Sequence, residues 1–208
     1  MSPDDFVASF AAAKVSAILR TDDQRRAAEA MRAAIRGGFR ILEFTLTVPG
    51  VHELITEFSG EDGVVVGAGT VLTPGDARDA VKAGARFLVS PVVDESVIAS
   101  AHALDVAVMP GVHTPSELWR AHQAGAQLQK LFPVPAGGPA WVRSVMGPMP
   151  FAKIVPTNGT SADNAREWLD AGAHALGFVA SVFDRDDIVQ EDWAAIEARA
   201  RAIVASVA

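Results

Sequence analysis

Lys130 is the residue of this chain whose position most strongly predicts chemistry. It lies within the apolar run Leu128 to Pro133, where a strand that is buried on both faces should carry no charge. The chain holds 4 lysines against 14 arginines, so a lysine inside a strand is a poor candidate for incidental surface charge. A buried lysine readily becomes a neutral amine, and a neutral amine can attack a carbonyl carbon. The position therefore indicates a lysine that condenses with a ketone.

A carboxylate in a second apolar run supplies the partner for this amine. Glu43 lies between Ile41 and Thr45, and alternation along a strand allows both Glu43 and Lys130 to face the interior. A lysine that forms a Schiff base needs an acid that moves protons, directly or through a water. The iminium then withdraws electrons, so that a carbon-carbon bond can break or form through an enamine. The alternatives are a buried structural ion pair, or a lysine that reaches outward between helices.

The elements that would position these residues alternate between strand and helix. Apolar runs recur about every 20 to 25 residues, an interval that fits one strand, one helix and two short loops. The predicted strands end near Leu19, Phe44, Ala68, Ser90, Pro110, Phe132, Pro156 and Val179. The predicted helices cover residues 21–36, 49–58, 73–83, 94–104, 114–124, 139–146, 161–171 and 186–204. Successive apolar residues in the strands are typical of a parallel sheet that is covered on both faces.

This pattern predicts an α/β fold, a (β/α)8 TIM barrel, with residues 1–208 as a single domain. An extra N-terminal helix over residues 3–13 is expected to cover the bottom of the barrel. An open doubly wound sheet is the alternative. In a barrel of eight strands, the second and sixth lie opposite each other, so Glu43 and Lys130 are expected to meet in one layer of the interior.

Further candidates lie near the ends of other predicted strands, where barrels carry their active sites. Arg20 ends the first strand, and Thr70 follows the third in a Gly-Ala-Gly-Thr turn. The loops after the seventh and eighth strands, 156–161 and 177–181, are short and rich in small residues, which suits a bound phosphate. The alternatives are a surface salt bridge for Arg20 and ordinary turns for the loops.

The composition excludes several other classes of function. The chain has no cysteine, and the spacing of its 5 histidines is not that of a metal site. His113 is a candidate for the barrel mouth or an ordinary loop residue, and the other four are expected at exposed helical positions. A net charge of -7 without a basic block argues against nucleic acid or an anionic membrane as the partner. With no export signal and no long apolar run, we expect a cytoplasmic protein that binds a small molecule.

Taken together, the motifs identify a family resemblance. The chain resembles the bacterial 2-dehydro-3-deoxy-6-phosphogluconate (KDPG) and 4-hydroxy-2-oxoglutarate (KHG) aldolases over nearly its whole length. The motifs that carry the resemblance are Ala17–Arg20, Leu42–Pro49, Val66–Val71, Val89–Pro91, Met109–Val112, Lys130–Pro133 and Val155–Thr157. It implies a class I aldolase with Lys130 as the Schiff-base lysine and Glu43 as the general acid/base. It also implies a homotrimer that needs neither a cofactor nor a metal.

The resemblance assigns the remaining site residues. Thr70 is implied to hold the pyruvate end of a 2-oxo acid substrate, and Pro91 and Phe132 to line the site. Some members bind the substrate carboxylate with an arginine at the position of Thr47, and here Arg20 resembles its replacement, so both positions are expected to contact substrate.

The phosphate site is where the sequence departs from the family. The family pattern Pro-Thr-Gly-Gly reads Pro-Thr157-Asn158-Gly159 here, and a usual Gly-Ser pair reads Ala180-Ser181. Phosphate is expected at Thr157, Asn158, Gly159 and Ser181, although the added Cβ atoms narrow the approach to the backbone.

The function expected from these residues is cleavage of a 2-oxo-4-hydroxy acid to pyruvate and an aldehyde, with the phosphorylated sugar acid as the leading substrate. Three alternatives remain at this point. They are decarboxylation of a 2-oxo diacid such as oxaloacetate by the same iminium, a phosphate-binding isomerase barrel, and a barrel that binds a sugar acid without catalysis.

Overall fold

Eight parallel strands form the centre of the molecule in a computed structural model that describes residues 1–208. The strands are β1 (Val15–Leu19), β2 (Ile41–Thr45), β3 (Val65–Gly69), β4 (Phe87–Ser90), β5 (Ala107–Val112), β6 (Gln129–Leu131), β7 (Ile154–Pro156) and β8 (Leu176–Phe178). They pair in the order β7-β6-β5-β4-β3-β2-β1-β8, and a bridge between Thr157 and Gly177 joins the two edges. Each strand ends within two residues of the predicted position. The predicted (β/α)8 barrel is confirmed.

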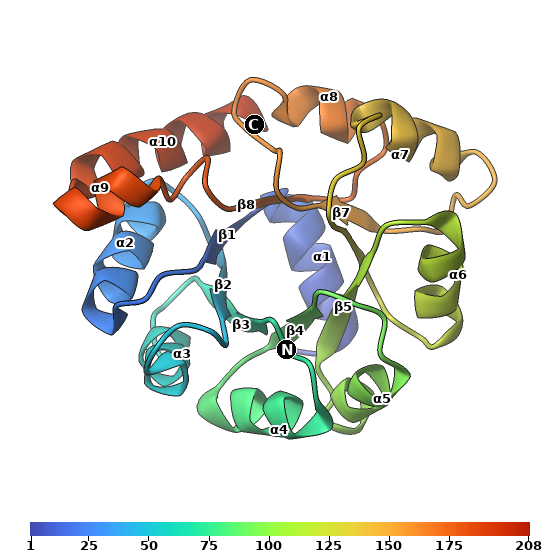
Figure 1. Cartoon of the computed structure of the whole chain (residues 1–208), viewed down its shortest axis with the longest axis horizontal. Coiled ribbons are helices and arrows are strands. Elements are labelled where there is room, and N and C mark those ends of the chain that lie inside the picture. The colour runs from blue at the N-terminus through green and yellow to red at the C-terminus, as the bar shows by residue number, and fades with distance from the viewer.

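The helices form a ring around the strands (Figure 1). They are α1 (Pro3–Ala13), α2 (Gln24–Arg36), α3 (Val51–Ser59), α4 (Pro74–Ala83), α5 (Glu95–Ala103), α6 (Pro115–Gln123), α7 (Pro139–Met146), α8 (Ala165–Asp170), α9 (Arg185–Gln190) and α10 (Trp193–Ser206). Capping boxes built on Thr73 and Thr114 begin α4 and α6. Gly84, with a φ of 117°, ends α4 in the left-handed conformation that glycine adopts without strain. None of the ten helices has the length and apolar character that a membrane span requires.

Two predicted helices differ from the structure. The single helix expected over 186–204 is wrong, because Glu191 adopts a left-handed φ of 61° and Asp192 caps a new helix by accepting the Ala195 N–H. The helix expected from residue 161 begins only at Ala165. Before it, a turn is held by the Ser161 N–H, which donates to Asn164 Oδ1 at 2.8 Å.

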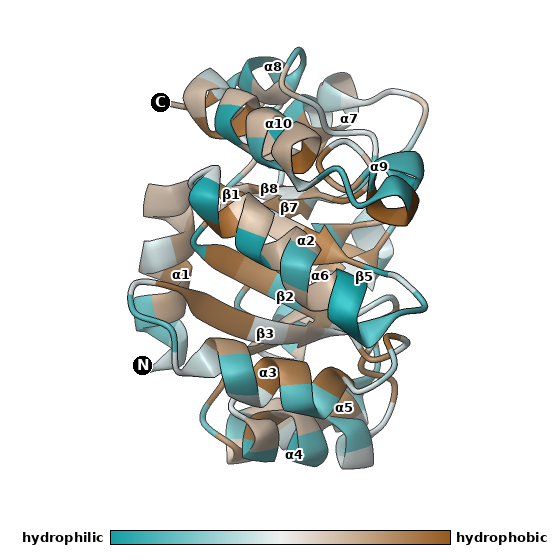
Figure 2. Cartoon of the chain, turned by 90° about the vertical axis from the view of Figure 1, so that its left-hand side faces the viewer, coloured by the Kyte–Doolittle hydropathy of each residue, from teal (hydrophilic) through white to brown (hydrophobic).

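The extra helix α1 closes the bottom of the barrel, as the sequence predicts. Its Phe6 ring stacks on Phe87 at the start of β4, with 4.4 Å between ring centroids. Phe6 and Phe10 are fully buried against the inward side chains of the strands. Figure 2 shows the apolar strands inside, the more polar helices outside, and α1 at the end of the barrel opposite to α9.

The inward face of the strands changes from apolar at the bottom to polar at the top. Near the bottom, the interior is filled by apolar side chains from four strands and from the residues just before β6 and β8. They are Ile41, Phe87, Val89, Ala107, Met109, Leu128, Val155 and Ala175. Above them lie Glu43 and Lys130, followed by Arg20, Thr70 and Thr157 at the open end. The fold therefore collects its inward polar groups where barrel enzymes carry their active sites.

Candidate active site

A cavity of about 220 Å³ opens at the carboxyl ends of the strands. Its lining residues are Ile18, Arg20, Thr45, Thr70, Pro91, Lys130, Phe132, Thr157, Asn158 and Val179. Seven of these were predicted as site residues from the sequence, whereas Ile18, Thr45 and Val179 were not. Those three carry no unusual chemistry, and only their inward register on strands β1 and β2 and at the end of β8 could have indicated them.

Lys130 on β6 and Glu43 on β2 approach each other at the floor of this cavity. The Nζ of Lys130 lies 3.9 Å from Oε1 of Glu43. Lys130 is 8% exposed and Glu43 is 1% exposed, so the amine reaches the cavity while the carboxylate lies beneath it. The Lys130 ammonium also lies over the Phe132 ring, 5.3 Å from its centroid, a geometry that favours a cation near an aromatic face. Glu43 of β2 and Lys130 of β6 therefore lie in one layer of the barrel interior, as expected for two even-numbered strands.

Burial dominates the electrostatics of Glu43. Both carboxylate oxygens are buried and accept no hydrogen bond from another protein group. Burial raises the pKa of the Glu43 carboxyl above its usual range, while the positive charges of Lys130 and Arg20 act in the opposite direction. A carboxyl group whose pKa is raised in this way can serve as both a proton donor and a proton acceptor nearer to neutral pH.

Gly69 makes room for this carboxylate. A Cβ atom added at Gly69 would lie 2.0 Å from Oε1 and 2.7 Å from Cδ of Glu43. In the sequence, the two glycines before Thr70 indicated only a tight loop. In the structure Gly69 is the last residue of β3, paired with Thr45, and its missing side chain leaves space for the Glu43 head group. Gly69 is thus a site residue that the sequence analysis missed.

Arg20 spans the cavity mouth. Its Nη1 donates to Thr47 Oγ1 at 2.8 Å, and its Nη2 donates to Thr70 Oγ1 at 3.0 Å. Thr70 itself adopts a φ of 63°, a left-handed conformation that is costly for a β-branched residue. No carboxylate pairs with Arg20, so the surface salt bridge considered for it is absent. The guanidinium therefore faces the cavity with a full charge to offer an anion.

The structure brings together only part of the predicted phosphate site. Thr157 and Asn158 line the cavity, whereas Gly159 and Ser181 do not. The Gly159 N–H donates to the side-chain oxygen of Asn158 at 3.1 Å, and the Ser161 N–H is taken by Asn164. Two amide groups that could bind an oxyanion are therefore already engaged within the loop.

The histidines lie outside the cavity. His113 Nδ1 contacts the carbonyl oxygen of Pro133 at 2.7 Å, which fits its interpretation as a loop residue. The expectation that His174 is an exposed helical residue is wrong, because it precedes β8, is half-buried and lies 3.2 Å from the carbonyl oxygen of Val7. The structure contains no group of three or more His, Cys, Asp or Glu side chains that could hold a metal ion.

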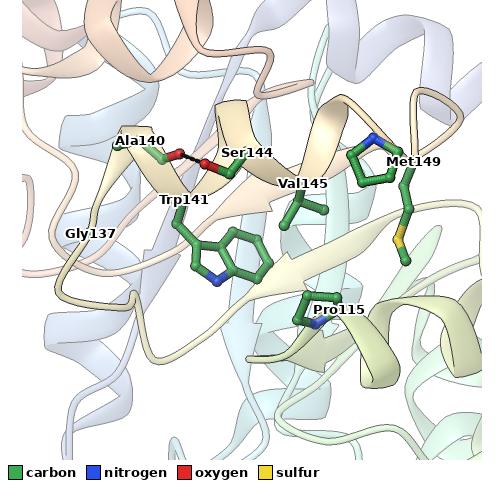
Figure 3. Close-up of a pocket in the computed structure, with 8 residues that line it drawn as sticks. Pro115, Gly137, Ala140, Trp141, Ser144, Val145 and Met149 are labelled. Carbon is green, nitrogen blue, oxygen red and sulfur yellow. Dashed lines mark hydrogen bonds between the residues drawn. The ribbon is translucent and has the colours of Figure 1, made fainter.

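A larger cavity of about 510 Å³ lies on the outer ring, between α6 and α7 (Figure 3). Its walls include Trp141, Val145 and Pro115. The Ser144 hydroxyl, its one side-chain hydroxyl, donates to the carbonyl oxygen of Ala140 at 2.9 Å. None of the predicted site residues lines this cavity, and it holds no ionisable side chain that could act as an acid or a base beside Ser144.

Comparison with known proteins shows the family of this chain. The model of the family described as KDPG and KHG aldolase matches residues 7–199. The 2-dehydro-3-deoxy-phosphogluconate aldolase of Pseudoalteromonas atlantica is 31% identical over 203 residues, which are 96% of this chain and 94% of that protein. The KHG/KDPG aldolase of Escherichia coli (strain K12) is 34% identical over 140 residues, and this match spans 66%, just under two thirds, of each chain.

A solved structure of a KDPG aldolase is similar to this chain in three dimensions. The crystal structure of KDPG aldolase from Legionella pneumophila, with pyruvate captured at low pH as a covalent carbinolamine intermediate, has a TM-score of 0.85 to this chain. The two sequences are 30% identical, and the match covers 95% of this chain and 97% of that one. By the family match and by its likeness to the Pseudoalteromonas protein, this chain belongs to the KDPG and KHG aldolase family.

Proposed function

We propose that this protein is a class I aldolase that cleaves a 2-oxo-4-hydroxy acid to pyruvate and an aldehyde. The observation that carries the proposal is the buried pair of Lys130 and Glu43, 3.9 Å apart at the base of a cavity that opens between the strand ends. A lysine and a carboxyl group in a closed site are the two groups that Schiff-base chemistry requires. Family membership supports the same reaction class.

The first half of the reaction forms the Schiff base. The neutral Lys130 amine attacks the C2 carbonyl carbon of the substrate, and the resulting carbinolamine loses water to give an iminium ion. Arg20 pairs with the substrate carboxylate at the mouth, where Thr70 and Thr47 hold the guanidinium in place. Pro91 and Phe132 provide the walls that keep bulk water away from the iminium.

The second half breaks the carbon-carbon bond. Glu43 removes the proton of the C4 hydroxyl group, directly or through a water. Its carboxylate is available for this step because Oε1 lies 3.9 Å from Lys130 Nζ, which is too far for a hydrogen bond to the amine. The C3–C4 bond then breaks, the aldehyde leaves, and the bonding electrons form an enamine with the iminium. Protonation of the enamine at C3 and hydrolysis of the new iminium release pyruvate and restore the Lys130 amine.

The finer substrate identity also belongs to this proposal. The leading substrate is 2-dehydro-3-deoxy-6-phosphogluconate, which gives glyceraldehyde 3-phosphate, and the second is 4-hydroxy-2-oxoglutarate, which gives glyoxylate. The names of the relatives support both. We also infer that residues 1–208 act as one domain in a cytoplasmic homotrimer, and light scattering of the purified protein tests the trimer.

Trapping of the intermediate tests the reaction class. The protein is incubated with pyruvate and borohydride, and the modified peptide is identified by mass spectrometry. A reduced pyruvyl adduct on Lys130 is expected, and the Lys130→Met variant should show none. An adduct on another lysine, or none in the active protein, would contradict the proposal. An isomerase barrel would form no adduct and would tolerate Lys130→Arg better than Lys130→Met.

A further inference from the structure

We propose that Thr45 is a positioning residue of the candidate active site, and that its hydroxyl group completes a hydrogen-bond chain which fixes the Arg20 guanidinium at the cavity mouth. This chain of bonds runs from Arg20 through the hydroxyl groups of Thr47 and Thr45 to the carbonyl oxygen of Leu19. The inference rests on the proposed function and deepens it, because it concerns the end of the site that is expected to hold the carboxylate of the 2-oxo acid.

A tight turn at the end of β2 brings the two threonine hydroxyls together. Thr45 is the last residue of β2, and its carbonyl oxygen accepts the Val48 N–H at 2.9 Å. Along an extended strand, residues two apart are separated by roughly 6 to 7 Å. The turn shortens this separation, so that Oγ1 of Thr45 and Oγ1 of Thr47 lie 3.0 Å apart. Thr45 is buried and Thr47 is exposed, so the chain of bonds connects the barrel interior to the exposed Arg20.

The direction of every hydrogen bond in the chain follows from its two ends. A guanidinium group only donates, and a backbone carbonyl oxygen only accepts. Arg20 Nη1 donates to Thr47 Oγ1 at 2.8 Å, and Thr45 Oγ1 donates to the Leu19 carbonyl oxygen at 3.2 Å. Each threonine hydroxyl has one hydrogen, so Thr47 must be the donor in the 3.0 Å bond to Thr45. The Thr45 hydroxyl therefore keeps Thr47 oriented as an acceptor for Arg20.

The same reasoning separates the two threonines that contact Arg20. Thr47 gives its hydrogen to Thr45, and it does not line the Lys130 cavity. Thr70 Oγ1 lines that cavity and accepts Arg20 Nη2 at 3.0 Å, and its hydroxyl donates to no other group of the chain. Thr70 therefore has a hydrogen to donate to the substrate carboxylate, whereas Thr47 only holds the guanidinium.

Fixing Arg20 in advance should increase its affinity for a carboxylate. Arg20 is exposed and pairs with no carboxylate of the chain, so its side-chain hydrogen bonds go only to the two threonines. A long side chain that is already ordered loses less conformational entropy when it binds a ligand. Hydrogen bonds in a chain also polarise one another, which strengthens each of them. Removal of the Thr45 hydroxyl should therefore weaken the binding of an anion at Arg20.

The test measures how much pyruvate is needed for half-maximal borohydride trapping on Lys130. This concentration should rise about 3- to 10-fold in Thr45→Val, the effect expected from the loss of one neutral hydrogen bond. The uncharged methyl ester of pyruvate offers Arg20 no anion, so its value should change by less than about twofold. Thr45→Ser keeps the hydroxyl group and should trap pyruvate like the native protein. Thr56→Val is the control, because it removes a threonine hydroxyl that donates to backbone carbonyl groups on the outer ring.

Two further variants separate positioning from a structural role. Thr47→Val breaks the same chain of bonds at an exposed position, so it should reproduce the loss without altering the barrel interior. In the Arg20→Ala background, Thr45→Val should cost less than about twofold more, because both changes remove one interaction. Losses that multiply in the double variant, equal losses on pyruvate and its methyl ester, or unchanged trapping in Thr45→Val would overturn the inference.

A separate measurement distinguishes the failure of this inference from the failure of the proposed function. If pyruvate forms no adduct on Lys130 in the native protein, the aldolase proposal fails. Calorimetric titration with oxamate, a carboxylate of similar shape that forms no Schiff base, then tests the role of Thr45. Oxamate binding that weakens in Thr45→Val and returns in Thr45→Ser would support that role, and unchanged or absent binding would overturn it.

Discussion

The Glu43 carboxylate lies 3.9 Å from the Lys130 amine, yet neither of its oxygens accepts a hydrogen bond. A buried ion pair normally offsets its cost of desolvation through close contacts and further hydrogen bonds. This pair is too far apart for a hydrogen bond, and no other protein group donates to either buried oxygen. The arrangement fits a carboxylate whose hydrogen-bond partners arrive with the substrate, and it is a poor arrangement for a purely structural ion pair.

Replacing Glu43 by glutamine should lower kcat for aldol cleavage by about 10²- to 10⁴-fold, the usual effect of losing a general acid or base. The Lys130 amine remains, so the borohydride-trapped pyruvyl adduct should still form in the Glu43→Gln variant. The pH-rate profile should also lose one limb, which in the native protein lies above the ordinary carboxyl pKa of 4.5 because burial raises the pKa of Glu43. Glu53→Gln, an exposed change on α3, is the control.

Decarboxylation gives a further readout from the same Glu43→Gln variant. Loss of carbon dioxide from an oxaloacetate iminium needs no base to remove a hydroxyl proton, so this activity should fall less than aldol cleavage. If both activities fall equally, or neither changes, Glu43 does not remove the C4 hydroxyl proton.

The same substitution should stabilise the fold at neutral pH. Because the pKa of Glu43 is raised in the folded protein, the native state binds more protons than the unfolded chain above pH 4.5. The free energy of unfolding contributed by this group therefore falls as the pH rises through the raised pKa. Urea unfolding should show that the advantage of Glu43→Gln over the native protein grows with pH from about 4.5 upward. An advantage that shrinks would show that attraction to Lys130 outweighs burial.

Adding a methyl group at Gly69 should act through Glu43. The new Cβ would lie 2.0 Å from Oε1, so the carboxylate must move by about 1 Å or more to restore ordinary contact, and a displacement of that size can cost about 10²-fold in rate. Gly69→Ala should therefore lower kcat while the rate of adduct formation on Lys130 stays within about threefold. Gly147→Ala is the control, since its added Cβ has no neighbour closer than 3.7 Å. Equal losses in both measurements would indicate a general disturbance of the barrel instead.

The sequence predicts the fold well because the strands and helices leave strong periodic signals. Lys130 and Glu43 are visible for the same reason, since a charge within an apolar strand is conspicuous. The break between α9 and α10 was missed, because the left-handed conformation of Glu191 has no signature in a residue type that usually continues a helix.

Other parts of the site depend on distances that a sequence does not contain. The space beside Glu43 exists only because β2 and β3 are in register at Thr45 and Gly69. The engagement of the Gly159 amide by Asn158 likewise depends on loop geometry, and the sequence analysis expected that loop to bind phosphate.

Moving the arginine from position 20 to position 47 should preserve part of the carboxylate binding. Arg20→Ala should raise the pyruvate concentration needed for half-maximal trapping by about 10- to 100-fold, because a charge-assisted pair is lost. The Arg20 guanidinium lies 2.8 Å from Thr47 Oγ1, so an arginine at position 47 begins beside the same space. The double variant Arg20→Ala/Thr47→Arg should recover at least part of the loss. No recovery, with the fold intact by circular dichroism, would place the carboxylate elsewhere.

His174 should make the seal between α1 and the barrel sensitive to acid. Its Nε2 lies 3.2 Å from the carbonyl oxygen of Val7, and the ring is half-buried. Burial lowers the pKa of His174 below 6.5, the hydrogen bond to Val7 raises it in part, and the positive charge of Lys153 lowers it further. The unfolded chain therefore binds more protons than the native state as the pH falls below about 6.5, and the stability that neutral His174 provides is lost in that direction.

Urea unfolding between pH 5 and pH 8 tests this effect. The free energy of unfolding should fall more steeply with acid in the native protein than in His174→Gln, and the exposed His52→Gln should behave like the native protein. A steeper acid loss in His174→Gln would mean that the protonated ring is bound more tightly in the folded state, and that the Val7 carbonyl outweighs burial.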